Sequence, residues 1–146
     1  MKQIQFSIKI QSSKENVWST LWNDTTFRIW ANIIDDGTYM VGELIQGKTV
    51  QFLSGSSGYG VTSYIEKVIP NEFIRFKHLQ DTMDLGSNTR EPEWSGGSES
   101  YSLRESEGCT TMLVIFDIPA EHVEMFEDIY PKALDCVRRM AEGESF

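Results

Sequence analysis

The sequence predicts an α+β fold, in which an antiparallel sheet is covered by a long helix near the end of the chain. Segments before residue 119 mostly alternate polar and apolar side chains, the period of strands with one face on a core. Turns rich in Gly, Ser and Asn separate these segments. Residues 119–143 instead repeat apolar side chains at steps of three or four, as an amphipathic helix does. The order of strand, two short helices, several strands and long helix is typical of an α+β domain.

Length and composition narrow the class of protein. The 146 residues fit one domain, residues 1–146, which is long enough to bury a core without disulfides. Thirteen Lys and Arg against 22 Asp and Glu give a net charge of −9 without a basic cluster, which disfavours nucleic acid and anionic membranes as partners. The first residues alternate as a strand does, and no later segment is an apolar run of membrane-spanning length. We therefore expect a soluble, cytoplasmic protein in which Cys109 and Cys136 are free thiols.

The first segments predict a strand and two short helices. Apolar residues alternate from Ile4 to Ile10, which indicates the first strand. Residues 12–15, Ser-Ser-Lys-Glu, have the spacing of a capping box and predict a helix start, and Asp24 is expected to cap a second helix. Most aromatic residues of these helices are expected to fill the core, and Trp30 is expected both to fill the core and to contact a ligand.

The middle of the chain predicts a run of strands. Residues 38–44 and 48–53 indicate a hairpin joined near Gln46-Gly47, and residues 59–69 and 73–79 indicate two further strands. Residues 80–97 are polar and have no sustained period, so they are interpreted as a long loop that Trp94 holds in place. The last two strands, 98–104 and 110–118, are predicted to form a hairpin around Glu107-Gly108.

The long helix has one continuous apolar stripe that a sheet must cover. Its members are Val123, Phe126, Tyr130, Leu134, Val137 and Met140, widened by Ile129, Ala133 and Ala141. Pro131 lies near the middle, where proline removes a backbone hydrogen bond, so a kink around residues 128–131 is expected. The alternative is two abutting helices.

The sequence contains one match to a nucleotide-binding motif and no recognisable metal or nucleophile motif. Residues 42–49, Gly-Glu-Leu-Ile-Gln-Gly-Lys-Thr, match the P-loop expression, but the residues after Lys48 form a strand pattern where a P-loop needs a helix. We therefore predict no nucleotide site there. His78 and His122 have no partner at metal-ligand spacing, and no serine lies in a nucleophile elbow, so no metal or cofactor is predicted.

Several short sequence motifs, spread over nearly the whole chain, resemble those of a known family. They are Val17-Trp18 with Leu21, Phe27 and Trp30, Gly60-Val61 with residues 66–76, Trp94, Glu99, Tyr101-Ser102-Leu103, Gly108, Thr110-Thr111, and Tyr130-Pro131-Lys132-Ala133-Leu134. They look like the homologues of the activator of heat shock protein 90 ATPase, within the START-related, birch-pollen-allergen-like (SRPBCC) superfamily. The resemblance implies a helix-grip fold, a curved antiparallel sheet that wraps a long C-terminal helix around a hydrophobic cavity. The long loop of residues 80–97 departs from the family pattern and lies where the rim of that cavity is expected.

Strand parity and helical spacing select the residues expected to face that cavity. They are Trp30, Phe76, His78, Glu99, Tyr101, Leu103, Phe126, Tyr130 and Leu134. Among them, Phe76 and Tyr101 on the sheet are expected to point towards Phe126 and Tyr130 on the helix.

Three functions follow as hypotheses. The leading one is a monomer or homodimer that binds a small apolar or amphipathic molecule and performs no chemistry. The second, implied by the resemblance, is a co-chaperone-like module of the stress response that touches a chaperone or another protein through its acidic surface or sheet. The third is a cyclase-like or hydrolase-like enzyme, in which His78, Glu99 and Tyr101 are the candidates for acid–base chemistry.

Overall fold

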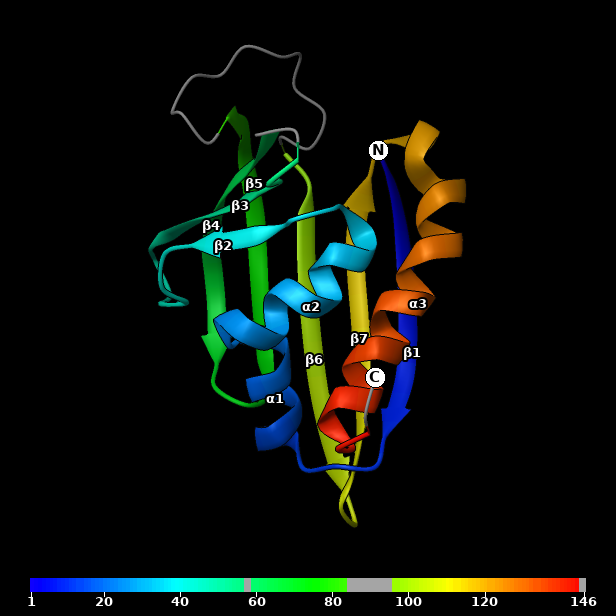
Figure 1. Ribbon diagram of the computed structural model, residues 1–146. Coiled ribbons are helices and arrows are strands. Elements are labelled where there is room, and N and C mark those ends of the chain that lie inside the picture. Colours follow the sequence, from blue (N-terminus) through cyan, green and yellow to red (C-terminus); the bar gives the residue numbers. More distant parts are fainter. Residues whose placement is uncertain (57–58, 84–95, 145–146) are drawn as a thin grey trace.

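The computed structural model describes residues 1–56, 59–83 and 96–144 and has an α+β architecture (Figure 1). Its strands are β1 (Lys2–Ile10), β2 (Tyr39–Val41), β3 (Thr49–Leu53), β4 (Tyr59–Ile69), β5 (Phe73–Met83), β6 (Ser98–Ser106) and β7 (Cys109–Ile118). They form one antiparallel sheet in the order β1-β7-β6-β5-β4-β3-β2. The first strand thus pairs with the last, from Lys2 opposite Ile118 to Ile10 opposite Thr110.

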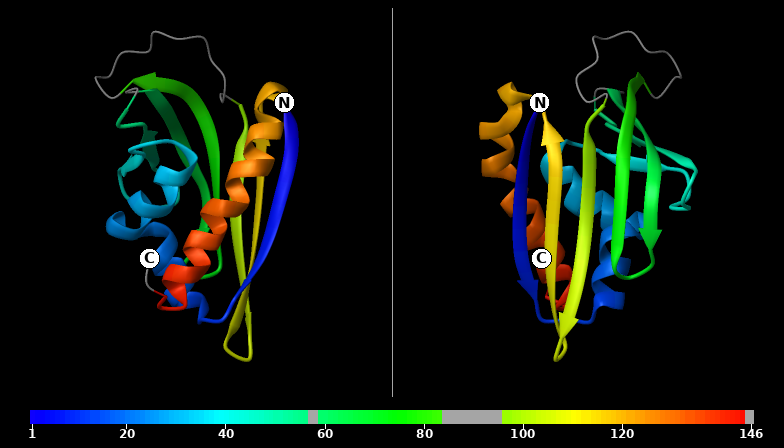
Figure 2. Two further views of the ribbon diagram at one scale, coloured as in Figure 1. Left: turned by 45° about the vertical axis from the view of Figure 1, so that its right-hand side comes forward. Right: turned by 180° about the vertical axis from the view of Figure 1, so that it is seen from behind.

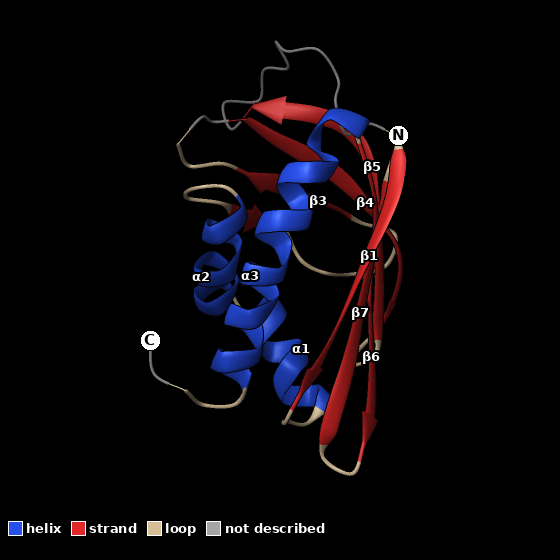
Figure 3. Ribbon diagram, turned by 90° about the vertical axis from the view of Figure 1, so that its right-hand side faces the viewer, coloured by secondary structure: helices blue, strands red, loops and turns tan. Residues whose placement is uncertain are grey.

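All helices lie on one face of this sheet (Figure 3). They are α1 (Lys14–Trp22), α2 (Asp24–Ile34), the short 3-10 helix η1 (Ala120–His122) and α3 (Val123–Ala141). The view from behind shows the other face of the sheet without a helix over it (Figure 2). The long helix runs across β1, β7 and β6, while α1 and α2 lie beside it over the rest of the sheet (Figures 1 and 2). This is the helix-grip fold.

The two short helices begin one residue away from their predicted caps. Ser13, and not Ser12, caps α1, because its hydroxyl accepts a hydrogen bond from the backbone N–H of Asn16 at 3.1 Å. The N-cap position of α2 is Asn23, and Asp24 is instead the first helical residue, where its carboxylate accepts from Arg28 Nε at 3.0 Å. Adjacent polar residues all fit a helix start, so their spacing left the register undecided.

The long helix continues through Pro131, so the alternative of two abutting helices is wrong. Pro131 is exposed on the side away from the sheet, where its ring meets solvent. It removes the N–H that would bond the carbonyl of Glu127, the usual cause of a bend at such a position. The bend itself stays a prediction.

Two strands differ from the predicted ones. β2 covers only Tyr39–Val41, so residues 42–44 of the predicted strand 38–44 lie outside it. The other difference is at β5. This strand runs on to Met83, so residues 80–83 are not part of a loop as predicted. The strand is longer than predicted because the backbone of residues 80–83 continues to pair with β4. The polar sequence hid this, since strand pairing uses backbone groups and does not require apolar side chains. The predicted loop residues 84–95, including Trp94, lie outside the described residues.

Two local predictions are correct, the hairpin turn at Glu107-Gly108 and the strand after Lys48. The β6–β7 hairpin turns at Glu107 and Gly108, whose φ angles of 52° and 77° match the left-handed pair that a two-residue hairpin favours. Lys48 of the P-loop match leads directly into β3, so the helix that a P-loop requires is absent from this described segment.

Candidate functional site

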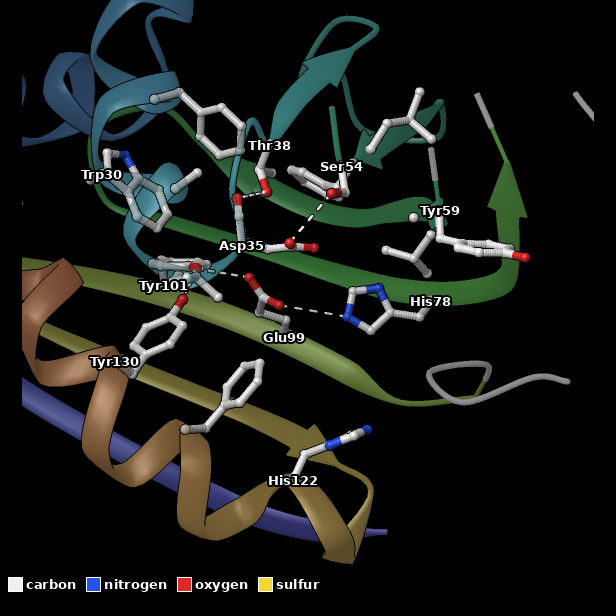
Figure 4. A pocket seen from close by; sticks show the side chains of 18 of the residues that line it. Trp30, Asp35, Thr38, Ser54, Tyr59, His78, Glu99, Tyr101, His122 and Tyr130 are labelled. Carbon is white, nitrogen blue, oxygen red and sulfur yellow. Dashed lines mark hydrogen bonds and ion pairs between the residues drawn. The ribbon is translucent and has the colours of Figure 1, made fainter. Parts of the chain in front are cut away.

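A pocket of about 450 Å³ opens between α1, α2, strands β3 to β6 and the first half of α3 (Figure 4). It is lined by Trp22, Phe27, Trp30, Ala31, Ile34, Asp35, Thr38, Phe52, Leu53, Ser54, Tyr59, Gly60, Val61, His78, Glu99, Tyr101, His122, Met125, Phe126 and Tyr130. A volume of this size suits a small organic molecule.

The pocket lies where the start of α3 packs loosely, since tight packing begins at Tyr130, which is 3% exposed. Ala133, Leu134 and Val137 are almost fully buried against the core. In the first half, Phe126 is only partly buried and Met125 is 51% exposed, and both line the pocket. The apolar stripe of the helix thus continues past the core and becomes one wall of the pocket.

The opposite wall is a cluster of aromatic rings centred on Trp22. Its ring makes edge-to-face contacts with Tyr101 at 5.0 Å and with Phe76 at 5.7 Å between centroids, and stacks near Phe27 at 6.2 Å. The indole N–H of Trp30 donates to the carbonyl of Leu21 at 3.0 Å, so this ring presents only its apolar surface. Such rings form a rigid apolar surface suited to a flat or aliphatic ligand.

A chain of polar side chains crosses the floor of the pocket from the sheet to α3 (Figure 4). The ring Nδ1 of His78 lies 2.7 Å from the hydroxyl of Ser63, and its Nε2 lies 3.6 Å from Oε1 of Glu99. Oε2 of Glu99 accepts a hydrogen bond from Tyr101 at 2.7 Å, and the hydroxyls of Tyr101 and Tyr130 are 2.5 Å apart. Since Tyr101 has one proton and donates it to Glu99, Tyr130 must donate to Tyr101.

Register explains this convergence. Ser63 pairs with His78 across β4 and β5, and Glu99 and Tyr101 are two residues apart on the helix-facing side of β6. Buried polar side chains need hydrogen-bond or ion-pair partners. His78 on β5 has such partners on both neighbouring strands, Ser63 on β4 and Glu99 on β6.

Burial dominates the titration of the two phenols. It raises the pKa of Tyr101 well above 10.0, and the negative charge of Glu99 raises it further. Burial and Glu99 also raise the pKa of Tyr130 well above 10.0, although the hydrogen bond with Tyr101 lowers it in part. Both hydroxyls therefore remain protonated at neutral pH and act as hydrogen-bond donors.

The rim of the pocket is held by a contact between two loops. The hydroxyl of Ser54 lies 3.3 Å from Oδ1 of Asp35, and the N–H of Gly55 donates to the carbonyl of Gly37 at 2.9 Å. A Cβ on Gly55 would lie 2.8 Å from that carbonyl oxygen, so only glycine allows this approach. The contact fixes Asp35 and Ser54 side by side at the mouth.

Six of the nine candidate residues line the pocket. They are Trp30, His78, Glu99, Tyr101, Phe126 and Tyr130. The other three, Phe76, Leu103 and Leu134, do not, because they are buried in the packed core instead. Whether the six bind a ligand stays a prediction.

The four rings of Phe76, Tyr101, Phe126 and Tyr130 were predicted to face one another, and this is correct for Tyr101 and Tyr130 but wrong for Phe76. Tyr101 contacts Tyr130, but Phe76 packs against Trp22 and Phe52. Trp22 comes from α1 and Phe52 from β3, and strand parity within β5 could not reveal that either ring covers Phe76. Phe126 contacts Phe116 and Tyr130.

Most residues of the rim have no signal in the sequence. Asp35 and Ser54 lie in connections between elements and His122 lies in η1, so no periodic pattern marked them. Thr38, the first residue of the predicted strand 38–44, lies just before β2. Trp22 is one of the helix aromatics expected to fill the core, and it also lines the pocket beside Trp30. The two cysteines are free as predicted, and burial raises the pKa of the Cys136 thiol.

In the described part of the chain, no cluster of three or more His, Cys, Asp or Glu side chains is arranged to hold a metal ion. Over the same residues, no helix has both the length and the apolar character needed to cross a membrane.

Solved structures share this fold over the whole chain. The Aha1 dimer from Colwellia psychrerythraea superposes with a TM-score of 0.72 at 20% identity, covering 100% of both chains. Protein MLL2253 from Mesorhizobium loti gives 0.76 at 9% identity, covering 99% of this chain and 100% of that one. DynU16, a putative protein in the dynemicin biosynthetic locus, gives 0.70 at 12% identity, covering 98% of this chain and 48% of its own. No family model and no curated protein matches the sequence. At these identities the likeness shows the fold alone.

Proposed function

We propose that this protein binds a small apolar or amphipathic molecule between its sheet and its long helix. The observation that carries the proposal is the pocket of about 450 Å³, with aromatic walls and a few converging polar groups. Binding sites for small molecules typically have this size and combination. A protein that acted only through its outer surface would have no need to keep this space open.

Buried hydroxyl groups support the proposal. Tyr101 and Tyr130 are 1% and 3% exposed and end at the pocket together with the carboxylate of Glu99. An apolar core gains more stability from filling such a space with methyl groups than from placing three polar groups beside it. Retaining them is the expected arrangement when a ligand with a polar end must be oriented.

The direct test is native mass spectrometry of the protein as purified from cells. We expect a retained mass that disappears on denaturation. As a second test, an apolar fluorescent probe should bind with one-to-one stoichiometry, and Phe126→Trp should block it because the larger ring intrudes on the pocket while the exposed side of α3 remains unchanged. Probe binding only where near-ultraviolet circular dichroism is already lost would report a molten state and refute the proposal.

Catalysis is a second candidate function, favoured by the pair of His78 and Glu99. Their side chains converge on the pocket 3.6 Å apart, and His78 is 4% exposed, so a base beside a bound substrate is sterically possible. The base-promoted ring opening of 5-nitrobenzisoxazole tests this, since it needs only a base in an apolar site. Acceleration in the wild type that is lost in His78→Asn and Glu99→Gln would favour an enzyme, and no acceleration in the wild type would favour binding alone.

A co-chaperone-like role is the third candidate, because one similar structure is an Aha1 dimer. The acidic net charge of −9 would suit a basic partner surface. Native mass spectrometry separates this role from ligand binding, since a partner protein and a small molecule differ greatly in mass.

A further inference from the structure

Glu99 is a largely buried carboxylate with few partners. Its side chain is 25% exposed, and among the described residues it accepts one hydrogen bond, from Tyr101 at 2.7 Å. In the part of the chain that the structure describes, its one ion-pair partner is His78, whose Nε2 lies 3.6 Å away, beyond normal hydrogen-bond distance. A carboxylate has about four acceptor sites, so most of the capacity of Glu99 remains unused.

The side chains that line the pocket and can be charged at neutral pH, among the described residues, are two carboxylates and two histidines. Asp35 and Glu99 line it together with His78 and His122, and no Lys or Arg is among the described lining residues. Figure 4 shows the carboxylates of Asp35 and Glu99 directed into the same space. An anionic ligand would meet repulsion here, whereas a cation would compensate a buried negative charge.

The aromatic walls reinforce this preference. Trp22, Trp30 and Phe126 line the same pocket as Glu99. The faces of aromatic rings carry partial negative charge and attract ammonium groups, most strongly when water is excluded.

From these contacts we infer that the pocket selects an apolar molecule that carries a protonated amine, with Glu99 as its counter-ion. The inference rests on the proposed function and adds to it the charge and the hydrogen-bonding character of the ligand. The ammonium donates hydrogen bonds to Glu99, while the apolar body of the ligand lies against the rings of Trp22 and Trp30. Fatty acids and other carboxylates are excluded as preferred ligands.

Three probes of the same length test the inference. They are 4-phenylbutylamine, 4-phenylbutanol and 4-phenylbutanoate, which differ only in the polar end, with affinities measured by titration calorimetry on the full chain. We expect the amine to bind about tenfold more tightly than the carboxylate, with the alcohol between them, because a charge-assisted hydrogen bond exceeds a neutral one.

The charge of Glu99 is tested by Glu99→Gln, which keeps an acceptor for Tyr101. The advantage of the amine should fall to within about twofold of the alcohol. Glu66→Gln, at an exposed position of β4 that does not line the pocket, removes the same charge and should leave the order unchanged.

Each outcome decides the question. Equal affinities for amine and carboxylate, or an unchanged order in Glu99→Gln, would overturn the inference. If none of the three probes binds while an apolar fluorescent probe does, the inference falls and the proposed function stands. If neither kind of probe binds, the proposed function falls as well.

Discussion

Tyr101 and Tyr130 share one hydrogen bond between β6 and α3, yet their hydroxyls have unequal roles. Tyr101 donates to Glu99 and accepts from Tyr130, so it stands in the middle of the chain, whereas Tyr130 stands at its end. Removal of the Tyr101 hydroxyl takes away a hydrogen bond from both neighbours, Glu99 and Tyr130. Removal of the Tyr130 hydroxyl takes away one hydrogen bond from Tyr101 and leaves the bond of Tyr101 to Glu99 in place.

This difference predicts unequal losses of stability. Tyr101→Phe should lower the free energy of unfolding by about 2–3 kcal/mol and Tyr130→Phe by about 1 kcal/mol, because a buried group that loses its partner is costly. Urea unfolding of both variants measures the difference. An equal or larger loss in Tyr130→Phe would contradict the direction of the hydrogen bonds assigned here.

The same two residues predict a loss of stability in alkaline solution. Their pKa values are raised above 10.0 in the folded state, whereas the unfolded chain has ordinary values. Above pH 10 the unfolded state therefore binds fewer protons than the folded one, so stability falls as the pH rises towards the folded pKa values.

Unfolding by urea at pH 9 and pH 11 measures this effect. Each tyrosine should contribute a decrease of up to about 1.4 kcal/mol per pH unit. The double variant Tyr101→Phe/Tyr130→Phe should show a smaller decrease than the wild type. The remaining tyrosines are present in both proteins, so equal pH dependence would show that the buried pair does not resist ionisation.

At the scale of elements, the pairing of β3 with β4 depends on Gly60. This glycine pairs with Leu53 beside the pocket, and a Cβ at this position would lie 1.9 Å from the carbonyl oxygen of Phe52 and 2.8 Å from Cα of Leu53. Both neighbours are backbone atoms that a rotamer change cannot move, so the strand must shift.

Gly60→Ala should therefore destabilise the fold by more than about 3 kcal/mol, since it displaces two paired strands. Gly47→Ala is the matched control, because Gly47 has a φ of 88° but nothing within 4 Å of the added Cβ. It should cost about 1 kcal/mol from backbone strain alone. Similar losses in both variants, measured by urea unfolding, would show that the close approach at Gly60 is not a constraint.

The long helix gives a second prediction at this scale. Pro131 is exposed within α3, and alanine there would restore the missing N–H of the helix ladder. Pro131→Ala should leave the protein as stable as the wild type or up to about 3 kcal/mol more stable, while a straighter helix changes the affinity for the apolar probe. A large loss of stability in thermal unfolding would mean that the native backbone requires the proline.

At the scale of the whole molecule, topology rejects the P-loop match. A nucleotide-binding loop joins a strand to a helix in a parallel sheet, and here the same letters join β2 to β3 of an antiparallel sheet. Lys48 is exposed on this connection.

Lys48→Ala should consequently change the free energy of unfolding by less than about 0.5 kcal/mol, as is usual for exposed positions. Millimolar ATP should not raise the melting temperature of either protein. An ATP-dependent rise in the wild type that is absent from Lys48→Ala would restore the nucleotide hypothesis.

The spacing of apolar residues along the sequence was sufficient to predict the α+β class, most strands and the long helix. The period of apolar residues indicates which face of an element is buried. This information is local, as the alternation of buried and less buried residues along β7 shows. The alternation of Ile74, Phe76 and His78 likewise placed His78 on the helix-facing side of β5 before the structure did. Turn chemistry located Glu107 and Gly108 for the same reason, since a left-handed backbone needs particular residues.

Only the tertiary structure decided where the interior is packed and where it is open. Phe76 and Phe126 satisfy the same sequence rule, but Trp22 of α1 and Phe52 of β3 cover Phe76, whereas Phe126 faces a pocket. Asp35, Ser54 and His122 line the pocket from three separate segments that have no common period. A pocket is space that distant segments leave between them, and its size depends on how those segments dock, which no local pattern of residues records.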